Sequence, residues 1–282
     1  MENNYRIKIV CDSSIDLPKN IIEEEDIEIL PFQVNLDNVC YYDGVTITVD
    51  KMYELVKKTK QLPKTSAFGP SIFYETAKKF SDYDAIIFTG IGSGFSSSYN
   101  SSKIGTQELE NVYCIDSKNL SSGTGLLVLK MIKMRKEGYK AEEIVSEIER
   151  LVPKVRTQFA VNTLEYLHMG GRCSGVSKLF GTMLRLKPII KVVDGKMGVA
   201  KKPIGFHKAL NAMLDECIRE KDNIDLDHIM VTHSKADEDA QYLISELSKH
   251  FDKNIILESH ASGTISTHCG PRTIGILYIV KE

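Results

Sequence analysis

Short apolar runs alternate with amphipathic stretches along the first half of the chain. Runs rich in β-branched residues predict strands, and apolar positions at helical spacing predict helices. The predicted strands cover residues 6–11, 27–36, 85–88 and 111–115. The predicted helices cover a short segment after Pro18 and residues 50–59, 70–80, 97–109, 126–137 and 141–151, with Asp50 as one helix cap. Strands that alternate with helices in this way indicate a parallel sheet covered by helices.

The pattern changes after Pro153, which we take as a domain boundary. Strands are predicted at residues 157–161, 189–193, 197–202, 228–232, 254–258 and 274–280, and helices at residues 206–220 and 236–250. The Asp-Gly pair at 194–195 separates two of these strands and is typical of a hairpin turn. The sequence therefore predicts an α/β protein of two domains, residues 1–153 with a mostly parallel sheet covered by helices and residues 154–282 with a mixed sheet and helices.

A glycine-rich loop follows the apolar strand at 85–88. It contains Gly90, Gly92 and Gly94, with Ser93 between the last two, and a helix is predicted to begin a few residues later. Free backbone amides, a small hydroxyl group and the positive end of a helix suit a small anion. Two other predicted strands also end in small polar residues, at Asp12-Ser13 and at Asp116-Ser117. Ligands bind at this edge of an open parallel sheet, so we expect the loop to hold an acid group.

Other interpretations of the loop compete with this one. A nucleophilic serine on a sharp strand-to-helix turn needs glycine two residues to either side, and Ile91 and Phe95 stand at those positions around Ser93. The glycines also partly resemble a dinucleotide-binding fingerprint, but the third comes one place too early, and the chain has no P-loop. Glycine occurs in loops chiefly because it allows backbone conformations that other residues disfavour. A tight turn without a ligand and an anion-binding loop therefore both stay open.

Three further polar positions carry candidate binding chemistry. Thr65 and Ser66 follow a proline and precede a predicted helix, so they are either ligand hydroxyls or a helix cap. Arg172 follows two glycines and suits bidentate contact with a carboxylate or phosphate, although an exposed loop arginine would look the same. His268 lies among small hydroxyl residues before a Gly-Pro turn, where it could donate to an anion or relay a proton.

Composition narrows the function class without identifying it. The chain has 282 residues, 42% hydrophobic and 26% charged, with a formal net charge of −2. This charge gives no reason to expect a nucleic acid as partner. The six cysteines form no CxxC pair and show no zinc-ligand spacing with the histidines, so we expect no metal and a reducing compartment. We find no apolar signal core and no run long enough to span a bilayer, which predicts a cytoplasmic protein.

Taken together, these pieces resemble the DegV family over nearly the whole chain. The characterised members of that family are fatty-acid-binding subunits of bacterial fatty acid kinase. The segments that carry the resemblance are Asp12-Ser13-Ser14, Asp16-Leu17-Pro18, Thr65-Ser66, Ser93-Gly94, Asp116-Ser117, Gly170-Gly171-Arg172, Leu186-Lys187-Pro188-Ile189, and Thr267-His268 with Gly270-Pro271. No single segment is specific, but their order and spacing along both halves are specific for the family.

The resemblance implies a two-domain carrier that holds one long-chain fatty acid between its domains. It implies that a separate fatty acid kinase subunit phosphorylates the carboxylate, so the chain would be a ligand-binding subunit in phospholipid metabolism. Such a subunit has no catalytic residues, no cofactor and no nucleotide site of its own, and at most transient contact with a membrane. The residues implied to bind the carboxylate are Thr65, Ser66, Ser93, Gly94, Arg172, Thr267 and His268.

An apolar segment around residues 169–186 is a candidate lining for the acyl tail. Large apolar residues gather there, namely Met169, Leu179, Phe180, Met183, Leu184 and Leu186. Each buried methylene contributes about 0.8 kcal/mol, so a long acyl chain could gain on the order of 10 kcal/mol before ordering costs. Methionine suits a tunnel of adjustable fit. The alternative is that these residues form part of an ordinary core.

Two further sets of positions concern docking of the kinase partner and the shape of the ligand site. Lys201 and Lys202 lie beside the predicted hairpin, near where the family carries basic residues for the kinase, although a solvated hairpin end would look the same. The chain departs from the usual family pattern at Ala67 and Phe68, where glutamine and proline are common, at Phe95, where threonine is usual, and at Arg272, where glycine is common.

Two further functions stay open from the residues alone. One is a small-molecule hydrolase that uses Ser93 and His268, which the failed serine-turn pattern disfavours. The other is a regulatory protein that senses a lipid or an anion without any kinase. The fatty acid carrier predicts that the distant polar segments meet at one end of a single cavity.

Overall fold

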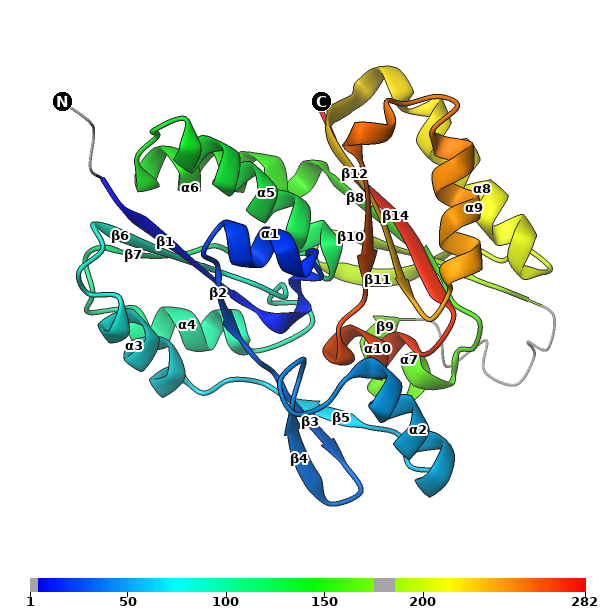
Figure 1. Ribbon diagram of the computed structural model, residues 1–282, viewed down its shortest axis with the longest axis horizontal. Helices are drawn as coiled ribbons and strands as arrows, with labels where there is room; N and C mark the ends of the chain where they lie inside the picture. Colours follow the sequence, from blue (N-terminus) through cyan, green and yellow to red (C-terminus); the bar gives the residue numbers. More distant parts are fainter. Residues whose placement is uncertain (1–4, 175–185) are drawn as a thin grey trace.

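Two large sheets dominate the computed structural model, which describes residues 5–174 and 186–282 (Figure 1). The smaller of the two is entirely parallel. Its strands, in spatial order, are β2 (Glu28–Leu30), β1 (Ile7–Asp12), β6 (Ala85–Thr89) and β7 (Val112–Cys114). The buried apolar runs of β1 and β6 are typical of strands covered on both faces.

The larger sheet has seven strands and is mixed. In spatial order they are β13 (Ile256–His260), β12 (Ile224–Ser234), β14 (Thr273–Val280), β8 (Val155–Ala160), β10 (Ile189–Val193), β11 (Lys196–Lys201) and β9 (Cys173–Ser174). The pairs β12–β13 and β11–β9 are parallel and the others are antiparallel. The α/β class, with a parallel sheet in the first half and a mixed sheet in the second, is confirmed. The proposed boundary between residues 153 and 154 stays a prediction.

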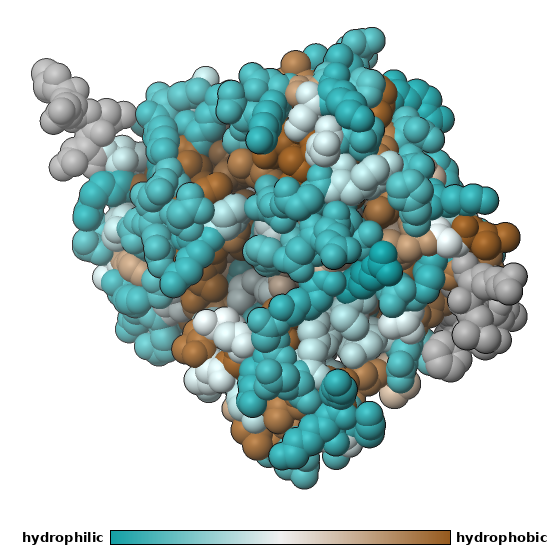
Figure 2. All heavy atoms as spheres, turned by 45° about the vertical axis from the view of Figure 1, so that its right-hand side comes forward, coloured by the Kyte–Doolittle hydropathy of each residue, from teal (hydrophilic) through white to brown (hydrophobic). Residues whose placement is uncertain are grey.

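A third, three-stranded sheet was not predicted. It contains β4 (Val39–Tyr42), β3 (Gln33–Leu36) and β5 (Lys64–Ser66), in that order. The single strand predicted over 27–36 is therefore wrong, because the chain leaves the parallel sheet after β2 and enters the small sheet at β3. Pro31 lies at the break, where its missing N–H group cannot continue a ladder. The small sheet projects at the lower end of the molecule, where hydrophobic spheres are visible on a largely hydrophilic face (Figure 2).

Ten helices are found in the described residues. They are α1 (Lys19–Glu24), α2 (Val49–Thr59), α3 (Pro70–Lys79), α4 (Ser98–Thr106), α5 (Ser122–Lys136), α6 (Ala141–Leu151), α7 (Glu165–Gly170), α8 (Phe206–Arg219), α9 (Asp237–Leu247) and α10 (Gly263–Cys269). Short 3-10 turns cover Ser13–Ile15, Val152–Lys154, Lys221–Asn223 and Lys253–Ile255. Within the described ranges, none of the helices combines the length and the apolar character needed to cross a bilayer.

Three helix predictions need correction. The cap of α2 is Thr48 and not Asp50, because the Thr48 hydroxyl accepts the Lys51 amide at 3.2 Å. Helix α5 begins at Ser122, four residues earlier than predicted, since small residues hide the helical pattern of its first turn. Helix α10 was missed, although Ser262 caps it by accepting the Ile265 amide at 3.3 Å.

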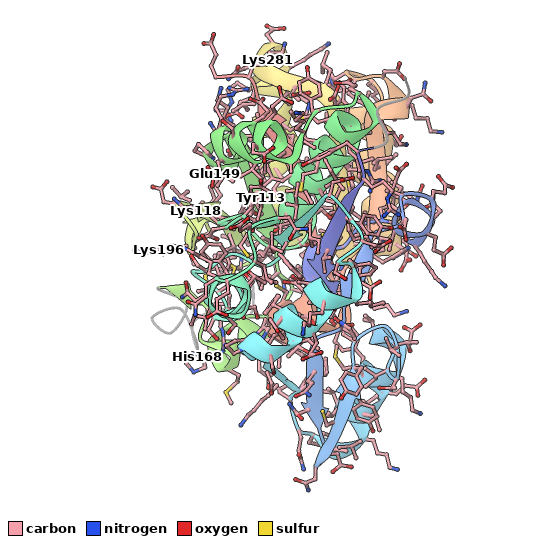
Figure 3. All side chains as sticks on the ribbon, turned by 90° about the vertical axis from the view of Figure 1, so that its left-hand side faces the viewer. Tyr113, Lys118, Glu149, His168, Lys196 and Lys281 are labelled. Atoms are coloured by element: carbon pink, nitrogen blue, oxygen red, sulfur yellow. The ribbon has the colours of Figure 1, made fainter. Side chains whose placement is uncertain are left out.

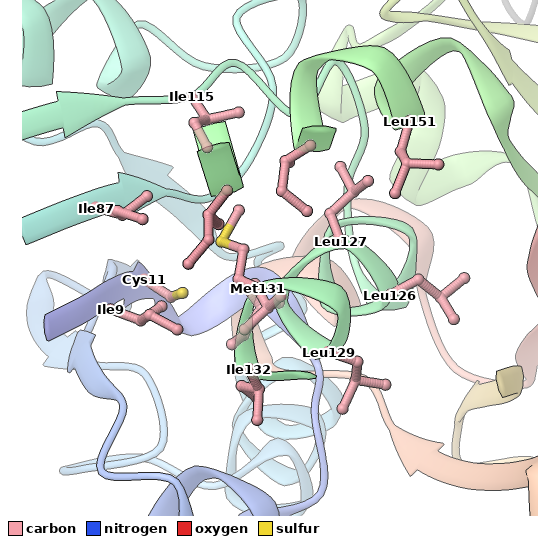
Figure 4. Packing of buried hydrophobic residues seen from close by; sticks show 14 of the residues in the cluster. Ile9, Cys11, Ile87, Ile115, Leu126, Leu127, Leu129, Met131, Ile132 and Leu151 are labelled. Carbon is pink, nitrogen blue, oxygen red and sulfur yellow. The ribbon is translucent and has the colours of Figure 1, made fainter. Parts of the chain in front are cut away.

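Helix α5 lies between the two large sheets, and its N-terminal part, residues 122–129, is buried on every side. Leu127 and Met131 are completely buried, and they belong to one cluster with Ile9 of β1 and Leu277 of β14. Figure 4 shows Ile9 of β1 beside Met131 and Leu127 of α5 in this packing. A helix buried on all faces is typical of the centre of a large core. The two sheets therefore share one hydrophobic core, while α8 and α9 cover the opposite face of the mixed sheet (Figure 1).

The shared core predicts a large cost for truncating α5. Replacement of Leu127 by alanine should lower the free energy of unfolding by about 2–5 kcal/mol, because it removes transfer energy and leaves a cavity. Leu226→Ala is the matched control, since Leu226 is 52% exposed, and it should change the value by less than about 0.5 kcal/mol. Equilibrium unfolding in denaturant measures both. Equal losses in the two variants would contradict a central role for α5.

Candidate ligand-binding site

The glycine-rich loop after β6 is packed tightly against three other segments. A Cβ atom on Gly90 would collide with the Asp12 carboxylate, and one on Gly94 would collide with the Gly195 carbonyl in the β10–β11 turn. A Cβ on Gly92 would meet the backbone after β7 at 2.7 Å. Each of these glycines is therefore required by a close approach of the chain. The loop joins the end of the parallel sheet to the hairpin of the mixed sheet.

Most amides of this loop are already occupied. Those of Ile91, Gly92 and Ser93 donate to acceptors within the protein at 2.7–2.9 Å. The Gly94 amide has no acceptor among the described residues, and α4 begins only at Ser98. The prediction that the loop amides are free to bind an anion is therefore wrong for Ile91, Gly92 and Ser93. The amide left for a ligand is that of Gly94.

Ser93 is exposed and bonded to the carboxylate of Asp116. Its hydroxyl donates to Asp116 Oδ2 at 2.5 Å, and its amide donates to Oδ1 at 2.9 Å. The partner of its hydroxyl is thus a carboxylate and not His268. The structure does not form the serine–histidine pair that a hydrolase would need.

His268 is paired with Thr65, which comes from a distant part of the chain. The Nε2 atom of His268 in α10 lies 2.9 Å from Thr65 Oγ1 in β5. The other ring nitrogen, Nδ1, is buried without a hydrogen-bond partner among the described residues, and it packs on Gly170, where a Cβ would come within 2.5 Å. We assign the ring proton to Nε2, because a buried N–H at Nδ1 would be unsatisfied. The Thr65 hydroxyl then accepts from His268 and keeps its own hydrogen for a ligand.

Burial controls the charge of His268. Desolvation, followed by the nearby Arg172 cation, lowers the pKa of His268 from 6.5 to about 4. The imidazole is therefore neutral at neutral pH and acts as a hydrogen-bond donor without a charge. Arg172 itself is exposed and donates to the Gly170 carbonyl from Nη1 at 2.6 Å. The positive charge at this end of the site thus belongs to Arg172.

These residues lie around one cavity of about 330 Å³. Its polar end is formed by Thr65, Ser93, Gly94, Arg172 and His268. Its apolar wall includes Phe32, Phe95, Leu120, Met197, Ile265 and Cys269. The volume falls within the range of about 300–1,000 Å³ for small-molecule sites. Segments far apart in the sequence therefore meet at one end of a mainly apolar space.

Two of the predicted carboxylate ligands do not reach the cavity. The Ser66 hydroxyl accepts from Asn35 Nδ2 at 3.0 Å, and the Thr267 hydroxyl donates to Met52 Sδ at 3.4 Å. Neighbouring side chains on a strand point to opposite faces, so Ser66 points away from the cavity that Thr65 lines. Neighbouring side chains on a helix also point in different directions, so Thr267 points away from the cavity that His268 lines. Thr264, which was missed, does line the cavity four residues before His268. The i, i+4 spacing would have indicated it had α10 been predicted.

The predicted tail lining receives little support. Met169 is 65% exposed and does not line the cavity, because α7 turns Tyr166 and Leu167 inward instead. Leu186 is half-buried and does not line it either. The predicted positions Leu179, Phe180, Met183 and Leu184 lie outside the described residues. Among the described residues, the apolar wall comes from the glycine loop, from β11, from α10, and from Phe32 and Leu120.

The positions that depart from the family pattern fall in different places. Ala67 and Phe95 line the cavity, and Phe68 stacks on the lining residue Phe32 with ring centroids 4.4 Å apart. Arg272 is turned away, with Nε 2.8 Å from Asp239 Oδ2. Three of the four departures therefore affect the shape of the cavity.

Buried aspartates hold the site together. Asp43, just after β4, accepts the amides of Gly263 and Thr264 at 2.8 Å each, which anchors the first turn of α10 and so places His268. Asp16 accepts the Ser262 amide at 2.8 Å, and burial raises the pKa of Asp16 to about 7. Their side chains connect the small sheet and the end of β1 to the mixed sheet.

A possible metal cluster lies elsewhere, at the ends of β12 and β13. Ligand atoms of His233, Asp237 and His260 lie within 4.8 Å of one another. However, His233 Nδ1 accepts the Ala236 amide at 3.2 Å, and its Nε2 lies 3.2 Å from a carboxylate oxygen of Glu258. Both ring nitrogens are engaged, so this group fits a metal ion poorly.

The lysines predicted to meet a kinase lie away from the polar end of the cavity. Lys201 Nζ is 3.1 Å from Glu216 Oε2, and Lys202 is exposed. Lys201 is the last residue of β11 and Lys202 follows it, at the end of the strand away from the turn that contacts Gly94. Their role in docking stays a prediction.

The fold and the site define a small-molecule-binding α/β protein, in which a mainly apolar cavity ends in hydroxyl, imidazole and guanidinium groups. The model of the DegV family, described as uncharacterised proteins, matches residues 6–281. A DegV domain-containing protein of Clostridium acetobutylicum is 33% identical over 98% of this chain and 99% of its own length. The protein DegV of Bacillus subtilis is 30% identical over 98% and 99%. The chain belongs to the DegV family.

Solved structures of other proteins have the same fold as this chain over nearly its whole length. A fatty acid binding DegV family protein from Thermus thermophilus has a TM-score of 0.90 and 27% identity, over 98% of this chain and 99% of that one. A stearic acid-binding protein from Eubacterium ventriosum has a TM-score of 0.85 and 28% identity, over 98% of both chains. The fold is therefore shared from end to end.

The depressed pKa of His268 predicts a specific loss of stability in acid. The folded protein binds the imidazole proton less readily than the unfolded chain, so the contribution of His268 is present above pH 6.5 and lost as the pH falls towards 4. The stability difference between wild type and His268→Gln should shrink by about 2–3 kcal/mol from pH 7 to pH 4.5. Denaturant unfolding at both pH values measures it. An unchanged difference would show that His268 titrates normally.

Proposed function

We propose that this protein binds one long-chain fatty acid in the cavity and presents its carboxyl group to a separate kinase subunit. The observation that carries the proposal is the Thr65–His268 pair at one end of a mainly apolar space, beside the Arg172 cation. The solved relatives from Thermus thermophilus and Eubacterium ventriosum, both above 25% identity, are described as fatty acid and stearic acid binders. They support the same ligand class for this chain.

The polar end suits a carboxyl group. A buried acid group is costly unless it is hydrogen-bonded or paired. The Thr65 hydrogen, the Gly94 amide and the Arg172 guanidinium provide donors and a positive charge for its oxygens. The acyl tail lies along the apolar wall, and each buried methylene contributes about 0.8 kcal/mol. Head and tail are therefore recognised by separate parts of one cavity.

Accessibility supports presentation to a partner. Ser93, Gly94 and Arg172 are all exposed, while the apolar lining residues Phe95, Leu120 and Ile265 are buried. A ligand held in this way would keep its carboxyl group near the surface and its tail inside. The kinase subunit would bring the nucleotide, and the acyl-phosphate would form on the bound fatty acid.

The binding part of the proposal is tested at Thr65. Thr65→Val keeps the shape of the side chain and removes its hydroxyl, so affinity for a C18 fatty acid should fall about ten- to hundredfold, the value of one hydrogen bond to an acid group. Ser66→Ala is the matched control, because the Ser66 hydroxyl is bonded to Asn35 and does not line the cavity. Titration calorimetry with delipidated protein measures both.

The outcomes separate clearly. Binding by Ser66→Ala should stay within about twofold of wild type. The binding proposal would be contradicted if wild-type protein took up no fatty acid and carried no acyl chain when purified from its host.

The kinase part is tested at the end of β11. Charge reversal at Lys201 and Lys202 should lower acyl-phosphate formation with a matching kinase subunit and ATP about tenfold, because rim charges steer association. Fatty acid affinity should not change. The same reversal at Lys57 and Lys58, which are exposed on α2, is the control. Undiminished acyl-phosphate, read by hydroxylamine trapping, would exclude these lysines from docking.

A further inference from the structure

The hydrogen of the Ser93 hydroxyl is engaged in a hydrogen bond with Asp116. Ser93 Oγ donates to Asp116 Oδ2 at 2.5 Å, and the amides of Ser93 and Lys118 both donate to Asp116 Oδ1, at 2.9 and 3.0 Å. An ionised carboxylate can only accept, so the donor direction of these three contacts is settled. Ser93 therefore offers the cavity its oxygen lone pairs and not a hydrogen.

This arrangement is poorly matched to a charged ligand head. A carboxylate oxygen placed against Ser93 Oγ would find no hydrogen there. Turning the hydroxyl towards the ligand would leave the ligand and Asp116 as two carboxylates on either side of one oxygen atom, each within hydrogen-bond distance of it. Like charges at such a distance favour a state in which one of them keeps a proton. Asp116 already accepts from two amides, so the proton stays with the ligand.

We propose that the cavity takes the fatty acid as the neutral carboxylic acid, with Asp116 as the positioning residue. Ser93 and Thr65 line the same cavity. The acid O–H donates to Ser93 Oγ, whose hydrogen is held by Asp116, and the carbonyl oxygen of the same group accepts from the Thr65 hydroxyl. Thr65 can donate because its oxygen accepts from His268. The two hydroxyls thus form a complementary acceptor and donor for one carboxylic acid group. This inference rests on the proposed fatty acid binding.

The remaining charges around the pair largely balance. The titratable and charged groups that face it are Tyr99, Lys118, Glu149, Arg172, Asp194 and His268. His268 is neutral, Lys118 and Arg172 are cations, and Asp194 and Glu149 are anions. Lys118, Glu149 and Lys196 lie along one edge of the molecule, open to solvent that screens them (Figure 3). Hydrogen-bond direction at Ser93 therefore decides the protonation state of the ligand.

The test is a pH titration of bound oleic acid labelled with ¹³C at its carboxyl carbon, followed by NMR. In Asp116→Asn the amide oxygen can still accept the two backbone amides, while its NH2 group donates to Ser93 Oγ and frees the Ser93 hydrogen for a carboxylate. The titration midpoint of the bound acid should be higher in wild type than in Asp116→Asn by about one pH unit or more. Asp194→Asn removes the same charge from the neighbouring turn and should leave the wild-type midpoint unchanged.

Three results of the titration would contradict either this inference or the proposed function. Equal midpoints in wild type and Asp116→Asn overturn the inference and leave fatty acid binding intact. A shift in Asp194→Asn as large as that in Asp116→Asn also overturns it, because the effect would then be a general field. Wild type with no bound signal at all overturns the proposed function itself.

A second measurement needs no variant. Oleamide matches the neutral acid, since its NH2 group donates and its carbonyl accepts, whereas methyl oleate has no donor. At pH 7.5 wild-type protein should bind oleamide at least as tightly as oleate, and methyl oleate about tenfold more weakly or worse. Oleate bound tenfold more tightly than oleamide would show recognition of a charged head and would overturn the inference even if Asp116→Asn failed to fold.

Discussion

Burial of helix α5 between the two large sheets is the interaction on which the rest of the structure depends. Leu127 and Met131 pack with apolar residues of both sheets, so each sheet would have one apolar face uncovered without this helix. The residue that precedes α5 also contributes to the polar junction, because the hydroxyl of Ser121 donates to Asp16. Hydrophobic burial therefore brings the strand ends together, and buried hydrogen bonds then set their relative position.

That relative position creates the site. Gly94 is pressed against the Gly195 turn, and Asp43 anchors the helix that carries His268. Thr65 enters from the small sheet, which would be marginal alone but is tied to α10 through the same aspartate. The cavity is thus assembled by contacts between sheets, and its polar residues come from segments that are far apart in the chain.

The polar end of the cavity is defined more by hydrogen-bond direction than by charge. His268 is held neutral by burial, Thr65 has a hydrogen to give, and the hydrogen of Ser93 is held by Asp116. Arg172 supplies the positive charge at the exposed rim. A site of this kind recognises one end of a mostly apolar molecule through a few oriented groups, while the apolar wall accounts for most of the affinity.

The sequence by itself determined the α/β class and most element positions, because apolar periodicity and glycine or proline breaks act locally. It also indicated Ser93, Arg172 and His268 through unusual local settings, and the ordered motifs indicated the family. It could not show that Pro31 sends one apolar run into two sheets, or that Ser66 and Thr267 turn away from the cavity. Nor could it pair Ser93 with Asp116 or Thr65 with His268, because such contacts depend on how strands and helices pack. Side-chain direction and long-range partners were decided only by the tertiary structure, since they arise from the close packing of segments far apart in the chain.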